Sequence, residues 1–234
     1  MPLENTIKPT WLTFDCYGTL IQWDEGLMQA VEQILVRRAI AMDPQTMIGI
    51  YDRHEHELEQ TPPHRSFRSV AGTALQRAMD ELGLRYHEDD IELLTTRISQ
   101  MPPFPEVVPA LAALKRAGFR LCIISNTDDA IIAGNVAKLG GYIDRVITAE
   151  QAQAYKPSPR IFKHAYRELG VSREEVVHIC ASPHLDHAAA RELGFRCIWV
   201  DRGTGRKLLP DYQPDGTVFR LDALPPLFAG LRWL

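Results

Sequence analysis

The sequence predicts an α/β fold: a doubly wound parallel-sheet core of the Rossmann-like type that carries an inserted helical cap domain. Two observations predict it. From residue 106 onward, short apolar runs alternate with amphipathic segments, which is typical of a parallel sheet covered by helices. Between residues 22 and 99, the pattern is that of amphipathic helices throughout. We therefore expect a core domain of residues 1–21 and 100–234 and a cap domain of residues 22–99.

The first predicted strand is the apolar run Trp11–Phe14, and a tight loop containing Gly18 follows it. Beyond this loop, apolar residues recur at spacings of three and four among many charged residues, and prolines or glycines interrupt the pattern. The predicted cap helices are Gly26–Arg38, Thr46–Glu59, Ser66–Leu82 and Glu88–Ser99.

The alternating region after the cap defines the rest of the core. In such sheets the ligand binds beyond the carboxyl ends of the strands, so the residues directly after each strand are candidates for chemistry. Residues 203–215 are predicted to form only a polar surface loop. The predicted strands are Arg120–Ile124, Arg145–Thr148, Val176–Cys180 and Cys197–Val200, and the predicted helices are Glu106–Ala117, Ala130–Leu139, Arg160–Leu169 and His187–Leu193.

Composition narrows the classes of function. The 234 residues, 45% of them hydrophobic, can bury a sizeable core. A charged fraction of 24% and a formal net charge of -4 argue against a nucleic-acid-binding face. No apolar stretch reaches the roughly 18 residues that a membrane span needs, and the start lacks the apolar run of a signal peptide, so we expect a cytoplasmic protein. The four cysteines lack metal-ligand spacing and are expected to be buried, reduced thiols.

Three strand ends supply the first candidate residues. Asp15 follows the first strand, and its ionised carboxylate can attack without the help of a base, although it can also serve as a turn cap. Ser125 and Asn126 follow the second strand, either as hydrogen-bond donors or as a helix N-cap. Lys156 stands in a proline-fixed loop, where a cation binds a substrate carboxylate or stabilises an oxyanion; the alternative is an exposed lysine.

Ser182 and Asp186 follow the strand that ends at Cys180, and a helix N-cap is again the alternative role for the aspartate. His184 and His187 flank this position, either as groups that titrate near neutral pH or in surface and capping roles. Four strand ends in order thus carry Asp, Ser-Asn, Lys and Ser-plus-Asp. Chance rarely supplies this combination, so it favours the chemical reading of each member.

This ordered set resembles the four motifs of the haloacid dehalogenase superfamily, and the resemblance spans almost the full length. The stretch from Phe14 to Leu20 looks like the first motif, Ser125-Asn126 the second and Lys156-Pro157 the third, and Ser182 with Asp186 looks like the fourth. A helical insertion directly after the first motif is also the usual place of the cap domain in this superfamily. The resemblance implies a hydrolase that forms a covalent ester on Asp15.

Tyr17 indicates the branch. Phosphatases of the superfamily keep a second aspartate at this position, which protonates the leaving group and helps to hold magnesium; a tyrosine supplies neither. Ala181 likewise stands where the metal-dependent members usually have an aspartate. The sequence is similar to the metal-independent L-2-haloacid dehalogenase branch, which displaces a halide from C2 of short 2-haloalkanoic acids. This implies a small-molecule carboxylate substrate and no cofactor or catalytic metal, and it leaves a homodimer open.

The resemblance also implies roles for the individual residues. Asp15 attacks C2 with inversion, and water then cleaves the ester at its carbonyl carbon. A cap arginine cradles the departing halide, and Arg53 is the best match by position; its alternative is a surface arginine in a solvated charge run with Asp52, Glu55 and Glu57, and its competitors are Arg37, Arg38, Arg65 and Arg68. The remaining catalytic residues are Thr19, Ser125, Lys156, Ser182 and Asp186, and the substrate-binding residues are Tyr17, Arg53, Asn126, Phe162 and Leu185.

Several departures from the branch keep other substrates open. Phe162 replaces its usual tyrosine, Ala181 and Pro183 replace a serine and an asparagine, and Leu185 replaces an aromatic pocket residue. The second hypothesis is a related hydrolase that opens a C–N bond of a small, cyclic 2-carboxylate. A magnesium-dependent phosphatase is the third, and a binding or scaffold protein without activity is the last.

Overall fold

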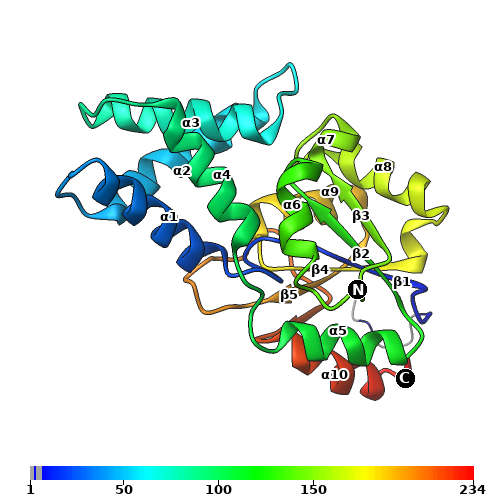
Figure 1. The fold of residues 1–234 in the computed structure, drawn as a ribbon. Helices are drawn as coiled ribbons and strands as arrows, with labels where there is room; N and C mark the ends of the chain where they lie inside the picture. The colour runs from blue at the N-terminus through cyan, green and yellow to red at the C-terminus, as the bar shows by residue number, and fades with distance from the viewer. Residues whose placement is uncertain (1–2, 4–6) are drawn as a thin grey trace.

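The structure is a computed structural model that describes residue 3 and residues 7–234; residues 1, 2 and 4–6 of the predicted core domain lie outside the described residues. The described residues form a six-stranded parallel sheet in the order β3-β2-β1-β4-β5-β6 (Figure 1). Its strands are β1 (Trp11–Phe14), β2 (Arg120–Ser125), β3 (Arg145–Thr148), β4 (Val176–Cys180), β5 (Arg196–Val200) and β6 (Gly216–Val218). The predicted doubly wound core is confirmed.

β1 lies at the centre of the sheet, with β2 paired on one side and β4 on the other. Its four side chains are all buried, as expected for a short apolar run covered on both faces. The chain runs from β1 outward to β3 and then crosses back to β4, so the direction of winding reverses next to β1. Ligand sites of such sheets lie at this reversal, beyond the carboxyl ends of the strands.

Helices cover both faces of the sheet. In Figure 1, α8 and α9 lie together on one side, and α5 and α10 lie together on the other. The sequence did not predict β6, α7 or α10, because each is too short to show a clear period. The core helices are α5 (Val107–Arg116), α6 (Asp129–Val136), α7 (Ala149–Ala152), α8 (Pro159–Leu169), α9 (Ala188–Leu193) and α10 (Leu224–Gly230), with short 3-10 turns at Arg173–Glu175 and Leu221–Ala223 and a π-helical turn at Pro183–His187.

Four helices between β1 and β2 pack on one another beside the sheet (Figure 1). The carboxylate of Asp43 accepts a hydrogen bond from Gln45 N at the start of the second, and the hydroxyl of Ser66 accepts one from Ser69 N at the start of the third. We propose that this unit is a cap domain with the boundaries 22–99. The four helices are α1 (Trp23–Arg37), α2 (Pro44–Gln60), α3 (Phe67–Glu81) and α4 (Glu88–Gln100).

The cap is docked on the core at the start of α3. The carboxylate of Asp128, a core residue after β2, accepts hydrogen bonds from the backbone N of Phe67 (2.7 Å) and Arg68 (2.9 Å). Tyr155 donates its hydroxyl proton to the carbonyl of Arg65 at 2.8 Å. The cap is thereby held over the carboxyl ends of the central strands. No helix among the described residues is both long and apolar enough to cross a membrane.

Candidate active site

Asp15 is held by hydrogen bonds at the carboxyl end of β1. Its Oδ1 accepts from Lys156 Nζ at 2.7 Å, and its Oδ2 accepts from Thr19 Oγ1 at 2.7 Å. Thr19 Oγ1 in turn accepts from the backbone N of Ala181 at 2.9 Å. Asp15 is only 6% exposed. These contacts hold the carboxylate in one orientation. They are not the hydrogen bonds to nearby backbone N–H groups that a turn cap would make.

Lys156 is a fully buried ammonium shared by two carboxylates. Its Nζ lies 2.7 Å from Asp15 Oδ1 and 2.9 Å from Asp186 Oδ1. Burial alone would lower the pKa of Lys156, but the two carboxylates raise it above its usual value. Burial would likewise raise the pKa of Asp186, yet Lys156 and then His178 lower it to about 2. Lys156 and Asp186 are therefore both charged at neutral pH.

His178 completes this network and was not predicted from the sequence. Its Nε2 lies 2.9 Å from Asp186 Oδ1, and its Nδ1 lies 2.8 Å from Thr13 Oγ1. Asp186 Oδ2 is buried and has no hydrogen-bond partner among residues 3 and 7–234. The available signal was a histidine in the middle of the otherwise apolar strand β4, because a buried imidazole needs polar partners.

Asp186 does not start a regular helix. The sequence predicted a helix from His187, whereas the structure has a π-helical turn over Pro183–His187 and α9 begins at Ala188. π-helical turns are rare in proteins, and those that occur are often found at functional sites. Here the turn carries the Asp186 carboxylate to Lys156, so the carboxylate does not cap the following helix.

A pocket of about 250 Å³ opens beside Asp15, between the core and the cap. Three of the predicted residues, Thr19, Lys156 and Asp186, form the buried network next to Asp15. Five further predicted residues line the wall of the pocket. The amide of Asn126 is already engaged, because Nδ2 donates to Glu59 Oε2 and to the Lys156 carbonyl while Oδ1 accepts from Lys156 N. The predicted wall residues are Tyr17, Ser125, Asn126, Ser182 and Leu185.

Tyr17 contributes an apolar wall. Its ring centroid lies 5.1 Å from that of Trp23, and its hydroxyl donates to Asn135 Oδ1 at 3.0 Å. Burial raises the pKa of Tyr17 well above its usual value, and the neighbouring Cys16 adds to this. The phenol therefore stays neutral, and its proton is directed at Asn135.

Two predicted pocket residues lie elsewhere. Arg53 does not line the pocket; its guanidinium donates to Glu81 Oε2 at 2.7 Å, and its side chain is 56% exposed. The pocket-facing residues of α2 are Asp52, Glu55, His56 and Glu59, and Arg53 is turned about 100° away from Asp52. Phe162 is buried in the core, with its ring 4.7 Å from that of Phe195. None of the competing arginines (Arg37, Arg38, Arg65 and Arg68) lines the pocket among the residues described.

The cap wall of the pocket is acidic. Asp52, Glu55 and Glu59 line it from α2, so the first two do not belong to the solvated charge run that was the alternative setting for Arg53. Burial raises the pKa of Asp52 to about 6. Burial also raises the pKa of Glu55 to about 8, against the opposing hydrogen bond from Tyr51, and raises that of Glu59 well above its usual value. Glu55 and Glu59 thus present protonated carboxyl groups near neutral pH, whereas Asp52 ionises above pH about 6.

Arg206, which the sequence analysis did not single out, brings a guanidinium to the pocket. It lines the pocket and donates to Asp24 Oδ1 at 3.1 Å. Residues 203–215 are therefore more than a polar surface loop. Gly18 has a φ of +78°, and a Cβ there would lie 2.8 Å from Arg206 Nη1, so glycine suits both the turn and the approach of the guanidinium.

The fold and the strand-end network define a class of hydrolase in which an aspartate follows the first strand and a buried lysine holds it. The chain belongs to the haloacid dehalogenase-like hydrolase family, whose sequence model matches residues 10–194.

Several characterised relatives share this sequence pattern. The haloacetate dehalogenase H-2 of Moraxella sp. (strain B) is 31% identical over 70% of this chain and 73% of its own length. An (S)-2-haloacid dehalogenase of Pseudomonas putida is 26% identical over 90% of this chain and 92% of its own.

A solved structure shares the fold over nearly the whole chain. It is the L-2-haloacid dehalogenase from Xanthobacter autotrophicus with chloropropionic acid covalently bound, which superposes with a TM-score of 0.81. The two sequences are 22% identical, and the match covers 95% of this chain and 99% of the other.

Proposed function

We propose that this protein hydrolyses small 2-substituted carboxylic acids through an ester on Asp15, with (S)-2-haloacids as the substrate. The observation that carries this proposal is the carboxylate of Asp15, oriented by Lys156 and Thr19 beside a pocket whose wall holds Tyr17 where a phosphatase keeps its acid. The dehalogenase activities of the relatives support the same chemistry. The substrate class comes from those relatives and from the attack geometry together.

In the first step, a carboxylate oxygen of Asp15 forms a bond to C2 while the bond from C2 to the halogen breaks, and the halide leaves with the bonding electrons. In the second step, water attacks the carbonyl carbon of the ester. This returns the Asp15 carboxylate and releases a 2-hydroxyacid and one proton. Asp186 Oδ2 and Ser125 Oγ, both buried and without partners in the described chain, are the groups that we assign to orient this water.

Arg206 takes the role of the cation in this scheme. Its guanidinium lines the same pocket as Asp15 and is restrained by Asp24, whereas Arg53 is engaged with Glu81 outside it. A guanidinium that contacts the substrate stabilises the charge that develops on a departing halide or that resides on a substrate carboxylate.

The direct test is release of chloride or bromide from (S)-2-chloropropionate and (S)-2-bromopropionate in the presence of a chelator. Wild type should release halide, and Asp15→Asn should not. A single turnover in ¹⁸O-labelled water should place the label in Asp15, because the water attacks the ester carbonyl. Absence of halide release from a panel of 2-haloacids would overturn the proposal.

The acidic wall supports a second candidate, the opening of a C–N bond in a small, cyclic 2-carboxylate. A departing amine needs a proton, which a halide does not. The raised pKa of Glu55, about 8, keeps this carboxyl group protonated at neutral pH and able to donate. A gain in protein mass on incubation with a strained cyclic imino acid, lost in Glu55→Gln and kept in the control Glu57→Gln, would favour this candidate over the halide reaction.

A magnesium-dependent phosphatase is less well supported. Tyr17 and Ala181 occupy the positions of two carboxyl groups used by that branch, and the Lys156 ammonium already pairs with Asp15 and Asp186. Phosphate release that depends on added magnesium would revive it. We also propose that the protein is cytoplasmic. A homodimer is compatible with the sequence.

A further inference from the structure

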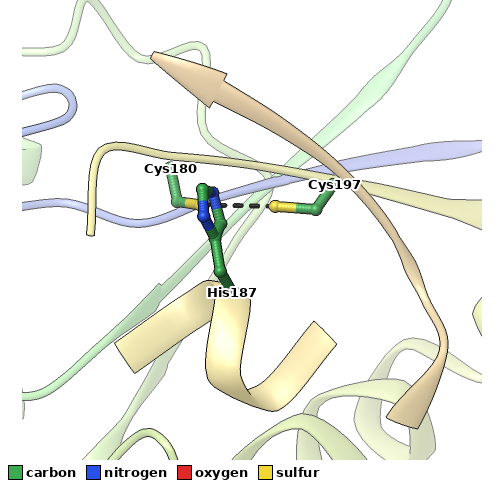
Figure 2. A group of neighbouring side chains, drawn as sticks. All are labelled: Cys180, His187 and Cys197. Carbon is green, nitrogen blue, oxygen red and sulfur yellow. Dashed lines mark hydrogen bonds between the residues drawn. The ribbon is translucent and has the colours of Figure 1, made fainter. Parts of the chain in front are cut away.

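Three metal-binding side chains meet next to the catalytic network, on the other side of Asp186. Cys180 ends β4, Cys197 lies in β5, and His187 ends the π-helical turn; Figure 2 shows the imidazole directed at the two sulfurs. The Sγ atoms are 3.4 Å apart, and one ligand atom from each residue lies within 4.8 Å of the others. All three residues are fully buried.

The sheet register brings the two cysteines together. Cys197 is paired with His178, two residues before Cys180 on the neighbouring parallel strand. Alternate residues of a strand point to the same face, so Cys180, His178 and Cys197 share one face of the sheet. The π-helical turn then places His187 over this face. No local sequence spacing is required for the arrangement.

His187 is the second, independent observation. Neither of its ring nitrogens has a hydrogen-bond partner among the residues that the structure describes. Its ring is enclosed by Tyr212, at 5.2 Å between centroids, and by Trp199, at 6.3 Å. Buried polar groups in native proteins are nearly always satisfied. The nearby His178 obeys this rule through Thr13 and Asp186, whereas His187 makes no such hydrogen bond and has the two cysteine sulfurs within 4.8 Å.

We propose that Cys180, Cys197 and His187 bind one zinc ion through two thiolates and one imidazole nitrogen. Thiolate sulfur and imidazole nitrogen are the ligands that zinc prefers, and two sulfurs bound at about 2.3 Å from one ion lie ~3–4 Å apart. On binding, the two thiols release one proton each, and His187 coordinates in its neutral form. The divalent ion with two thiolates then has no net charge, which suits a fully buried site.

The ion would act on structure rather than on the substrate. His187 directly follows Asp186, so a bond from the ion to His187 anchors the π-helical turn that positions the Asp186 carboxylate. The site is separate from the pocket, since none of its three ligands lines it. The inference therefore stands or falls independently of the substrate proposed above.

Metal content is the first test. The full chain is produced in zinc-supplemented medium, purified without chelators, and analysed by elemental mass spectrometry. We expect stoichiometric zinc in wild type and in the control Cys122→Ser, which alters a buried cysteine outside the cluster. Cys180→Ser, Cys197→Ser and His187→Gln should each lose the metal. Equal trace zinc in wild type and the cluster variants would overturn the proposal.

A second measurement needs no variant. Wild type stripped of metal and titrated with Co²⁺ should develop the sulfur-to-cobalt charge-transfer bands of an ion bound by thiolates, saturating at one Co²⁺ per chain. Absence of these bands would refute the site. Thiol counting in denaturant provides a further check, because a disulfide between Cys180 and Cys197 in the freshly purified protein would show a redox pair instead of a metal site.

Discussion

Replacing Lys156 by methionine tests whether the buried ammonium holds two carboxylates together. The substitution keeps a long unbranched side chain and removes only the charge, leaving Asp15 and Asp186 buried without their shared partner. Removing one member of a buried ion pair destabilises proteins by about 3–5 kcal/mol. The lowering of the Asp186 pKa from 3.8 to about 2 is equivalent to roughly 2.5 kcal/mol, of the same order.

The pH dependence gives the prediction its sign. Because the pKa of Asp186 is lowered in the folded state, its contribution is fully present above pH ~4 and is lost as the pH falls toward about 2. Without Lys156, burial would raise the Asp186 pKa instead. The difference in stability between wild type and Lys156→Met should therefore be largest near neutral pH and should shrink in acid.

Urea unfolding at pH 7 and at pH 4.5 measures both effects. The control is Lys163→Met on the exposed surface of α8, for which we expect a change within about 0.5 kcal/mol. Equal stability of the two variants at pH 7 would show that the ammonium is not what holds the carboxylates. A difference that grows on acidification would contradict the assigned charges.

Three further predictions concern chemistry and cap docking. Asp15→Asn should lower turnover by at least ~10⁴-fold with little change in Tm, because it removes the nucleophile; residual activity above a tenth of wild type would exclude a covalent role. In steady-state assays, Arg206→Gln should lower kcat/KM by ~10²-fold and Arg53→Gln should leave it unchanged. A loss in Arg53→Gln without one in Arg206→Gln would show that the catalytic cation is Arg53 of α2. Asp128→Ala removes the carboxylate that caps the N-terminus of α3, an interaction worth about 1 kcal/mol, so the Phe67 amide should exchange faster in hydrogen-exchange mass spectrometry. Unchanged exchange would argue against docking of the cap domain through this contact.

Much of the fold was predictable because it depends on local periodicity. Buried parallel strands appear as short apolar runs, and the helices between them repeat every three to four residues. The strand boundaries agree to within one residue for the five strands predicted from the sequence. β6, with three residues, and the π-helical turn at Pro183–His187 lack such a period and were missed.

The candidate site was predictable where it lies at strand ends. Parallel strands bring their carboxyl ends to one edge, so Asp15, Ser125 and Asp186 had to converge once the topology was known. Arg53 was misplaced because a charged helix offers several faces, and only packing against α3 decides which one meets the pocket. Arg206 was missed because a polar loop carries no signal for the segment that it contacts.

The sequence alone determined the α/β class, and it predicted a cap insertion and Asp15 as the nucleophile, since each depends on short-range pattern or on an ordered set of motifs. Only the tertiary structure decided what surrounds them. It placed Glu55 in the pocket wall, and it joined His187 to two cysteines that stand 17 residues apart in the chain. The physical reason is that sheet register and helix packing are set by burial of the whole core, which no local spacing encodes.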